Sequence, residues 1–294
     1  MYSRWNALDA TQQKRETMNR RTFQNRPLSN EELIQVAPSA FAAEPWHAQS
    51  SRYTFIPTSR VIEGMRNAGF MPYNAIQSRT RIPGKSDYTK HLIRFRPQNV
   101  QLANLGDTAV EVVLVNSHDG SSRYELSAGA FRLACLNGLM VAESLIEAIK
   151  IRHTGNIISE VIDATRRILD RAPIVADTIN RWKAINLAPA EARILAEEAH
   201  SLRFEEGSPV EPTRLLQPRR REDNGTDLWT TFNRIQENTI AGGLRTYTQP
   251  THDENGRYVP ARRNSTRAVV GIAENTKLNR ALWSLGEKMA ALKS

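Results

Sequence analysis

The chain has 294 residues, of which 40% are hydrophobic and 24% charged, a composition that excludes wholesale disorder. No run approaches the roughly 18–20 apolar residues of a membrane helix, and the first residues are polar where a signal peptide is apolar, so we expect a cytoplasmic protein without membrane contact. The net charge of +9 comes from 32 Arg and 8 Lys against 31 acidic residues and divides into +8 for residues 1–96, −5 for 97–213 and +6 for 214–294. This distribution favours a polyanionic partner, although a GC-rich genome also enriches Arg.

The first part of the chain predicts little regular structure. Residues 1–50 lack sustained hydrophobic periodicity, which predicts a basic, loosely ordered N-terminal arm with one short helix after Ser29. Such an arm is equally consistent with a segment that becomes ordered on a polyanion and with a solvated tail. After the arm, a strand is expected at Arg52–Ile56, and Ser59 is expected to cap a helix that ends at Gly69.

Strand patterns dominate the next segment. Two pairs of alternating runs flank the turn sequences Pro83–Ser86 and His118–Gly120, which predicts two β-hairpins. The expected strands are Tyr73–Ile82, Asp87–Arg96, Ala109–Asn116 and Ser122–Leu133. We therefore expect an antiparallel meander of at least four strands.

Helical periodicity follows and continues to the end of the chain. The expected helices run from Leu139 to Ile149, from Ile157 to a break near Pro173, from Pro189 to Leu202, from Asp227 to Gly242, and from Leu278 to Leu292, with a Pro-rich linker at 207–218. The fold class is thus α+β, with a core at 51–213 and a basic, helical C-terminal region at 214–294. Within that region a mobile loop is expected at about 246–267.

The second strand of the first hairpin is the strongest candidate binding surface. Alternation places Tyr88, Lys90, Arg94 and Arg96 on one face. With Arg79, Arg81 and Lys85 across the turn, this face predicts a positive ribbon with an aromatic ring, the combination that binds single-stranded nucleic acid. The alternative is an edge hairpin whose charges prevent aggregation.

Two further arginine groups are candidates for phosphate contact. Arg219, Arg220 and Arg221 follow the Pro-rich linker, and Arg262 and Arg263 lie in the expected loop. Both groups are equally compatible with solvated surface charge.

The sequence offers no recognisable catalytic centre, and we expect no metal, no cofactor and no enzymatic activity. The six histidines lie far apart in the sequence, and Cys135 sits in an apolar string typical of a buried thiol. Asp163, Asp170 and Asp177 recur every seven residues and could hold a magnesium ion, but a solvated stripe is the simpler explanation. Nucleotide-binding, serine-hydrolase and zinc-protease motifs are absent.

Several strings resemble a family of phage/plasmid-like proteins, a mobile-element domain of unknown function. They include Ser51–Thr58, His91–Phe95, Ala130–Leu139, Asp227–Trp229 and Phe232–Asn238, and the resemblance covers about residues 50–245. It implies a bacterial or phage setting. In topology and charge the chain is also similar to phage single-strand annealing proteins, which implies a homo-oligomer that holds DNA in a basic groove.

These observations predict a sequence-independent nucleic-acid-binding protein of a phage or plasmid. Single-stranded DNA is the favoured partner, with a role in annealing, recombination or replication. The first alternative is an interaction protein that inhibits a host defence or replication factor. The second is a metal-dependent enzyme without a recognised motif.

Overall fold

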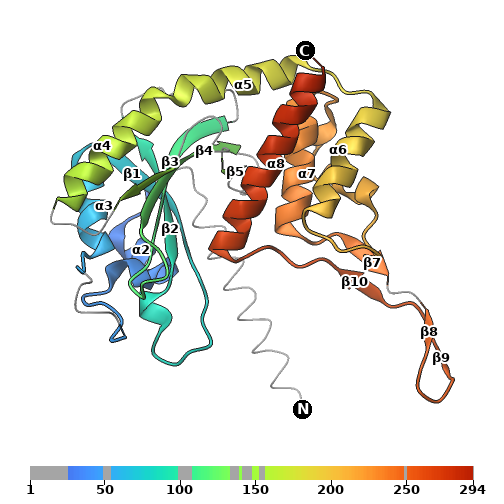
Figure 1. Ribbon diagram of the computed structural model, residues 1–294, viewed down its shortest axis with the longest axis horizontal. Helices are drawn as coiled ribbons and strands as arrows, with labels where there is room; N and C mark the ends of the chain where they lie inside the picture. Colours follow the sequence, from blue (N-terminus) through green and yellow to red (C-terminus); the bar gives the residue numbers. More distant parts are fainter. Residues whose placement is uncertain are drawn as a thin grey trace. The chain divides into compact units, whose positions relative to one another are not determined.

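The protein is described here by a computed structural model, which covers residues 26–48, 54–98, 108–132, 139–140, 148–151, 156–247 and 250–293. The fold is α+β, as predicted (Figure 1). The chain forms two compact units. The first combines Met1–Leu102, Val110–Ala128 and Ala148–Asp170, and the second combines Ala103–Ala109, Gly129–Glu147 and Arg171–Ser294. The expected boundary at 213/214 falls inside the second unit.

The predicted meander is confirmed. Its strands are β1 (Phe70–Gln77), β2 (His91–Pro97), β3 (Thr108–Asn116) and β4 (Tyr124–Arg132), in sheet order β1-β2-β3-β4. Two short strands, β5 (Leu139–Met140) and β6 (Ile149–Ile151), each pair antiparallel with β4. Alternating apolar residues explain the sheet, because Ile93, Phe95, Val112 and Leu114 are all fully buried.

The first hairpin differs from its predicted form. β1 ends at Gln77 and β2 begins at His91, so residues 78–90 form a long connection that contains the 3₁₀ turn η2 (Ser86–Tyr88). The Thr89 hydroxyl donates to the carbonyl oxygens of Ser78 and Ser86, 2.9 Å from each, and so closes this connection. The prediction of a strand from Asp87 is therefore wrong, and Tyr88 and Lys90 do not lie on a strand face.

The prediction of a loosely ordered arm over residues 1–50 needs correction for residues 26–48. The short helix after Ser29 is confirmed as α2 (Asn30–Val36), where Ser29 and Glu32 form a capping box. The turn η1 (Pro38–Phe41) follows, and the Leu28 and Leu33 side chains are buried. The Leu28 amide also donates to the carbonyl of Pro72 on β1 at 2.7 Å. Residues 1–25 of the expected arm lie outside the described residues.

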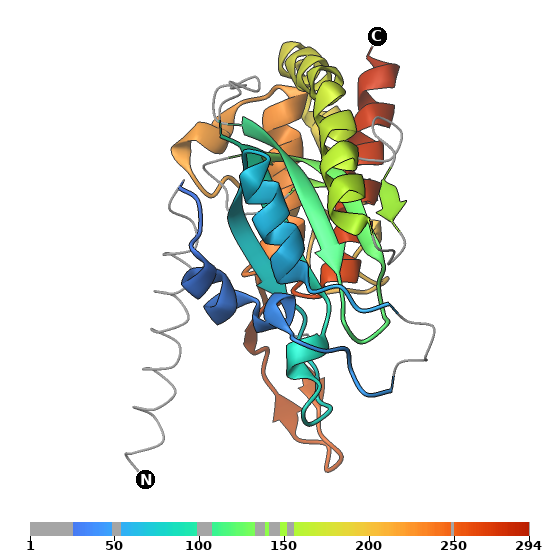
Figure 2. The same cartoon turned by 90° about the vertical axis from the view of Figure 1, so that its left-hand side faces the viewer.

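Two helices cover one face of the sheet in the first unit. They are α3 (Thr58–Asn67) and α4 (Ile157–Asp170), and Figure 2 shows both on the same side of the strands. Their close packing depends on Gly64, where an added Cβ would collide with the Ile158 side chain. α3 begins at Thr58, so Ser59 lies inside the helix instead of capping it.

The helix predicted from Leu139 to Ile149 is wrong at both ends, where β5 and β6 lie. β6 pairs with β4 through Leu126 opposite Ile149 and Tyr124 opposite Ile151. β-Branched residues suit such pairing, which outweighs the local helical pattern. The interior of the expected helix, Cys135 and part of the expected strand at 52–56 lie outside the described residues.

The second unit contains α5 (Ala172–Ala184), α6 (Pro189–Ser201), α7 (Leu228–Ala241) and α8 (Ile272–Leu292), with the turns η3 (Pro212–Leu216) and η4 (Arg221–Asn224). The predicted break at Pro173 and the start at Pro189 are confirmed. The core is aromatic: the rings of Trp182 and Trp283 are centred 4.7 Å apart, and Trp182 packs against Gly286. In the described part of the chain, no helix is both long and apolar enough to span a bilayer.

Candidate nucleic-acid interface

The expected mobile loop at about 246–267 contains regular structure. It contains two short antiparallel strand pairs, called here together the ribbon (the described residues 245–247 and 250–265). The paired elements are β7 (Arg245–Tyr247) with β10 (Arg263–Ser265) and β8 (Thr251–His252) with β9 (Tyr258–Val259). The two strand pairs share one register. Wherever two residues lie opposite each other, both are equally far from Asn255 in the sequence. Figure 1 shows β8 and β9 extending away from the helices of the second unit.

Local sequence explains both ends of the ribbon. At the tip, the Asp253 carboxylate accepts hydrogen bonds from the amides of Asn255 (3.0 Å) and Arg257 (2.8 Å), and Gly256 has a φ of 75°. At the base, the Leu244 and Gly243 amides donate to Thr266. The neighbouring Gly242, with a φ of 67°, lies so close to the Arg267 backbone that a Cβ would not fit.

The exposed faces of the ribbon combine arginine with aromatic rings. Arg263 lies directly opposite Tyr247, and Arg245 lies two residues along the same strand, so all three side chains share one face. The Tyr247 side chain is 59% exposed and the Tyr258 side chain 61%, whereas Thr246 on the other face of β7 is buried. The ribbon carries four arginines (Arg245, Arg257, Arg262, Arg263) against two acidic residues, and all four are exposed. These properties suit a flexible polyanion with aromatic groups.

The first predicted basic surface is largely engaged within the protein. Arg79 and Arg81 are exposed on the long connection between β1 and β2. Lys85 forms an ion pair with Asp119 at 3.1 Å, and Tyr88 packs against Trp46 with ring centroids 5.3 Å apart. Lys90 lies at the end of the connection and is half-buried.

Arg94 and Arg96 do not form the expected exposed face. Arg94 is 8% exposed, and its Nε donates to the carboxylate of fully buried Glu111, 2.5 Å away. The Nε of Arg96 donates to the other oxygen of the same carboxylate, and its guanidinium lies over the Tyr73 ring. Glu111 on β3 lies beside both arginines because β2 and β3 pair antiparallel. Both arginines therefore bind a carboxylate inside the sheet. This corrects the exposed basic face of the first hairpin that alternation predicted.

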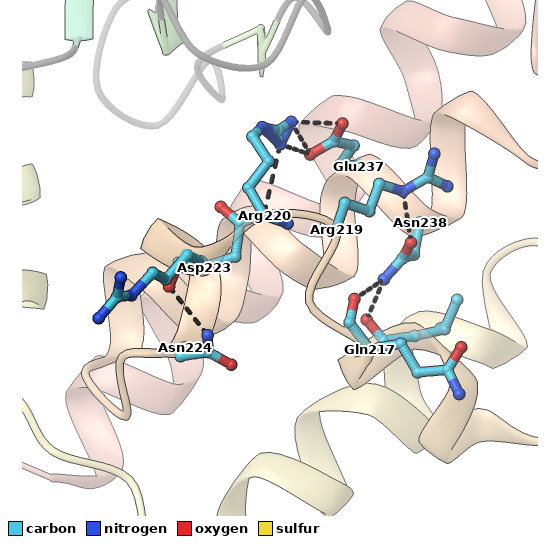
Figure 3. Close-up of polar contacts among 9 residues, drawn as sticks. Gln217, Arg219, Arg220, Asp223, Asn224, Glu237 and Asn238 are labelled. Carbon is cyan, nitrogen blue, oxygen red and sulfur yellow. Dashed lines mark hydrogen bonds and ion pairs between the residues drawn. The ribbon is translucent and has the colours of Figure 1, made fainter.

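The triple arginine Arg219–Arg221 is divided between internal contacts and solvent, and Figure 3 shows the contacts of Arg219 and Arg220. Arg220 forms a forked ion pair with Glu237 on α7, with closest contacts of 2.6 Å, and also reaches Asp223. The Arg219 Nε donates to Asn238 at 2.7 Å, and its guanidinium reaches the Gly242 carbonyl. Two of the three arginines therefore attach the Pro-rich segment to α7, and Arg221 is exposed.

Sequence reasoning missed a buried polar cluster at one end of the sheet. Four groups surround the Thr58 hydroxyl: His91 Nε2 at 2.9 Å, Asn116 Nδ2 at 3.0 Å, His118 Nε2 at 3.1 Å and the Tyr124 hydroxyl at 3.3 Å. All five side chains are at most 1% exposed. His91 and His118 are distant in sequence, but β2 and β3 pair with His91 opposite Asn116, which brings them together. The register of β2 and β3 creates the cluster. This register cannot be read from the spacing of the two histidines in the sequence.

The two histidine rings differ in their polar neighbours. His91 Nδ1 lies 3.0 Å from the Ser39 hydroxyl and 3.3 Å from the Thr89 carbonyl, and its Nε2 lies 2.9 Å from the Thr58 hydroxyl. His118 Nε2 contacts the same Thr58 hydroxyl. Burial, followed by the neighbouring His118, lowers the pKa of His91 to about 3, so this ring is neutral.

Neither the histidines nor the aspartate stripe forms a metal centre in the described residues. The point on which both His Nε2 atoms converge is filled by the Thr58 hydroxyl. Asp163 and Asp170 lie on α4 and Asp177 on α5, and Asp163 is exposed beside Arg166. Within the ranges described, no group of three or more His, Cys, Asp or Glu side chains is arranged to hold a metal ion.

Comparisons with known proteins find a matching family model and similar proteins of Escherichia coli. The model of the family described as "Domain of unknown function (DUF932)" matches residues 45–283. The chain is 40% identical to the UPF0380 protein YafZ of Escherichia coli (strain K12) over 266 residues, 90% of this chain and 92% of that protein. It is 39% identical to the UPF0380 protein YfjQ of the same organism, with the same coverage. No solved structure matches significantly.

Proposed function

The chain belongs to the family described as Domain of unknown function (DUF932), and within it we propose that this protein binds nucleic acid without sequence specificity. The observation that carries the proposal is the exposed face of the ribbon with Arg245, Tyr247 and Arg263. Arginine forks match phosphate oxygens, and a projecting hairpin reaches a nucleic-acid backbone more easily than a flat surface does. The net charge of +9 adds long-range attraction to a polyanion.

Binding of this kind does not require a catalytic centre. In the proposal, the ribbon holds the backbone of DNA in recombination or replication of a mobile element, and the protein performs no hydrolysis. The secondary candidates for phosphate contact are Arg262, directly before β10, and the exposed Arg221, Arg79 and Arg81. Arg94, Arg96 and Arg220 are not, because their guanidinium groups bind carboxylates of the protein.

The test is fluorescence-anisotropy binding of a labelled oligonucleotide of about 20 nucleotides, longer than a typical single-strand site, across a salt series. We expect the logarithm of the affinity to fall linearly with the logarithm of the salt concentration. The double variant Arg245→Gln/Arg263→Gln should bind more weakly and lower the magnitude of the slope by about 1.4, because two phosphate contacts are lost.

The control removes the same charge elsewhere in the second unit. Arg193 on α6 and Lys277 on α8 are exposed, and the double variant Arg193→Gln/Lys277→Gln should keep the wild-type slope. An equal loss in both double variants would show that net charge alone drives binding. Absence of wild-type binding at low salt would refute the proposal and favour a protein partner.

A further inference from the structure

We propose that the ribbon is a stacking platform for single-stranded nucleic acid, with Tyr247 and Tyr258 as the base-contacting residues. This inference rests on the proposed function and specifies its ligand. The sequence pattern predicted Tyr88 as the stacking residue. Tyr88 is half-buried against Trp46, whereas both ribbon tyrosines expose more than half of their surface.

The first half of the platform is the pair formed by Tyr247 and Arg263. The two residues are directly opposite on β7 and β10, so their Cβ atoms lie on the same face within reach of a single nucleotide. A ring and a guanidinium placed side by side bind the two parts of a nucleotide: the ring stacks on the base, and the guanidinium contacts the phosphate. Arg245, two residues from Tyr247 on β7, extends the positive charge along the strand.

The second half lies nearer the tip. Tyr258 is directly opposite His252, and the two rings meet edge to face with centroids 5.9 Å apart. This contact restricts the tyrosine ring, while the side chain remains 61% exposed. Such ordering reduces the conformational entropy that the side chain loses when a base stacks on it.

The two tyrosines belong to separate strand pairs of the ribbon. Tyr247 shares a face with Arg263 in the β7–β10 pair, and Tyr258 shares a face with His252 in the β8–β9 pair. A single strand is flexible enough to present one base to each of these exposed rings. The stiff duplex hides the faces of its bases, and a ribbon in its major groove presents only one face to base edges. The arrangement therefore favours a single strand.

The experiment compares three ligands of equal length: a polythymidine strand, the same strand with abasic sites, and a duplex. The variants Tyr247→Leu and Tyr258→Leu keep apolar bulk and remove the ring, and the matched controls Tyr247→Phe and Tyr258→Phe keep it. We expect each Leu variant to weaken binding to polythymidine by about fivefold or more, and each Phe variant to bind like the wild type. Because both side chains are exposed, circular dichroism spectra of all four should match that of the wild type.

The abasic strand separates stacking from charge. It should bind the wild type more weakly than polythymidine binds either Leu variant, because it removes both stacking contacts at once, and the Leu substitutions should then have no further effect. Equal affinity of wild type for duplex and polythymidine, or Leu variants with unchanged affinity, would overturn the inference while salt-dependent binding still supports the proposed function. Absence of wild-type binding to all three ligands would overturn both.

Discussion

Arginine occurs in two contrasting settings in this protein, the sheet of the first unit and the ribbon of the second. Arg94 is 8% exposed and donates to fully buried Glu111, whereas Arg263 is exposed beside an exposed tyrosine. The charge is the same in both settings, but only the second is available to an external anion. The comparison shows that one acidic residue on a neighbouring strand decides whether an arginine is bound within the fold or stays exposed to solvent.

The same contrast applies to polar side chains in general. The sheet of the first unit buries His91, His118, Asn116 and Thr58 in one hydrogen-bonded cluster, so its polar groups depend on one another. The arginines and tyrosines of the ribbon face water. Substitutions in the sheet should therefore lower stability, and substitutions in the ribbon should change binding alone.

The largest effect should follow removal of the buried carboxylate. Glu111→Gln takes away the charge that faces the Arg94 and Arg96 guanidinium groups, and we expect a loss of about 3–5 kcal/mol in the free energy of unfolding. Urea denaturation measures this loss in the free energy of unfolding. Glu63→Gln on the exposed side of α3 is the control and should stay within about 0.5 kcal/mol. A loss in Glu111→Gln as small as in the control would mean that the buried pair contributes little.

Acid should destabilise the first unit through His91. The pKa of this ring is lowered to about 3 in the folded protein, below the ordinary value of 6.5. The unfolded state therefore binds more protons at intermediate pH, and stability falls as the pH drops from 6.5 toward 3. For this group the slope reaches about 1.4 kcal/mol per pH unit. Urea unfolding at a series of pH values should show a shallower slope in His91→Gln; an identical slope would contradict the assignment.

Removal of the hydroxyl at the centre of the cluster should cost less. Thr58→Val keeps the shape of the side chain but leaves His91 Nε2 and His118 Nε2 without this hydrogen bond, and we expect a loss of about 2–3 kcal/mol. Ser59→Ala, the next residue on α3, is the matched control. Thermal or urea unfolding should show a clearly smaller change for Ser59→Ala, and equal changes would argue against the network.

The base of the ribbon offers a pair of adjacent glycines for comparison. Both have positive φ, but an added Cβ meets the Arg267 backbone at Gly242 and open space at Gly243. Gly243→Ala should cost only the strain of the left-handed conformation, about 1–2 kcal/mol, and Gly242→Ala should cost more because the chain must also move apart. Hydrogen exchange of the β7 and β10 amides would localise the damage to the ribbon.

The smallest effects on stability should occur on the ribbon itself. Tyr247→Leu and Arg263→Gln should each change the free energy of unfolding by less than about 0.5 kcal/mol, because neither side chain is buried. A larger loss by urea denaturation would show that these residues support the fold, and would remove the contrast with Glu111.

Local sequence signals predicted most of the helices and the meander correctly. Ser29, Asp227, Pro173 and Pro189 mark helix starts or breaks because capping and proline geometry act within one turn of chain. The ribbon was missed although Asn255-Gly256 is a hairpin signal, since the surrounding polar residues suggested a structureless loop. A search for that dipeptide between short β-branched or aromatic runs would have found it.

The sequence by itself determined the α+β class, the order of the four meander strands and of the long helices after them, and the excess of arginine, because these follow from composition and short-range periodicity. The tertiary structure alone decided which arginines are exposed and which histidines meet. Arg94 reaches Glu111, and His91 joins His118, through the register of β2 and β3, and strand register is a long-range property set by how whole hydrophobic faces pack. For this reason the exposed arginines beside exposed tyrosines lie on the ribbon and not on the first hairpin.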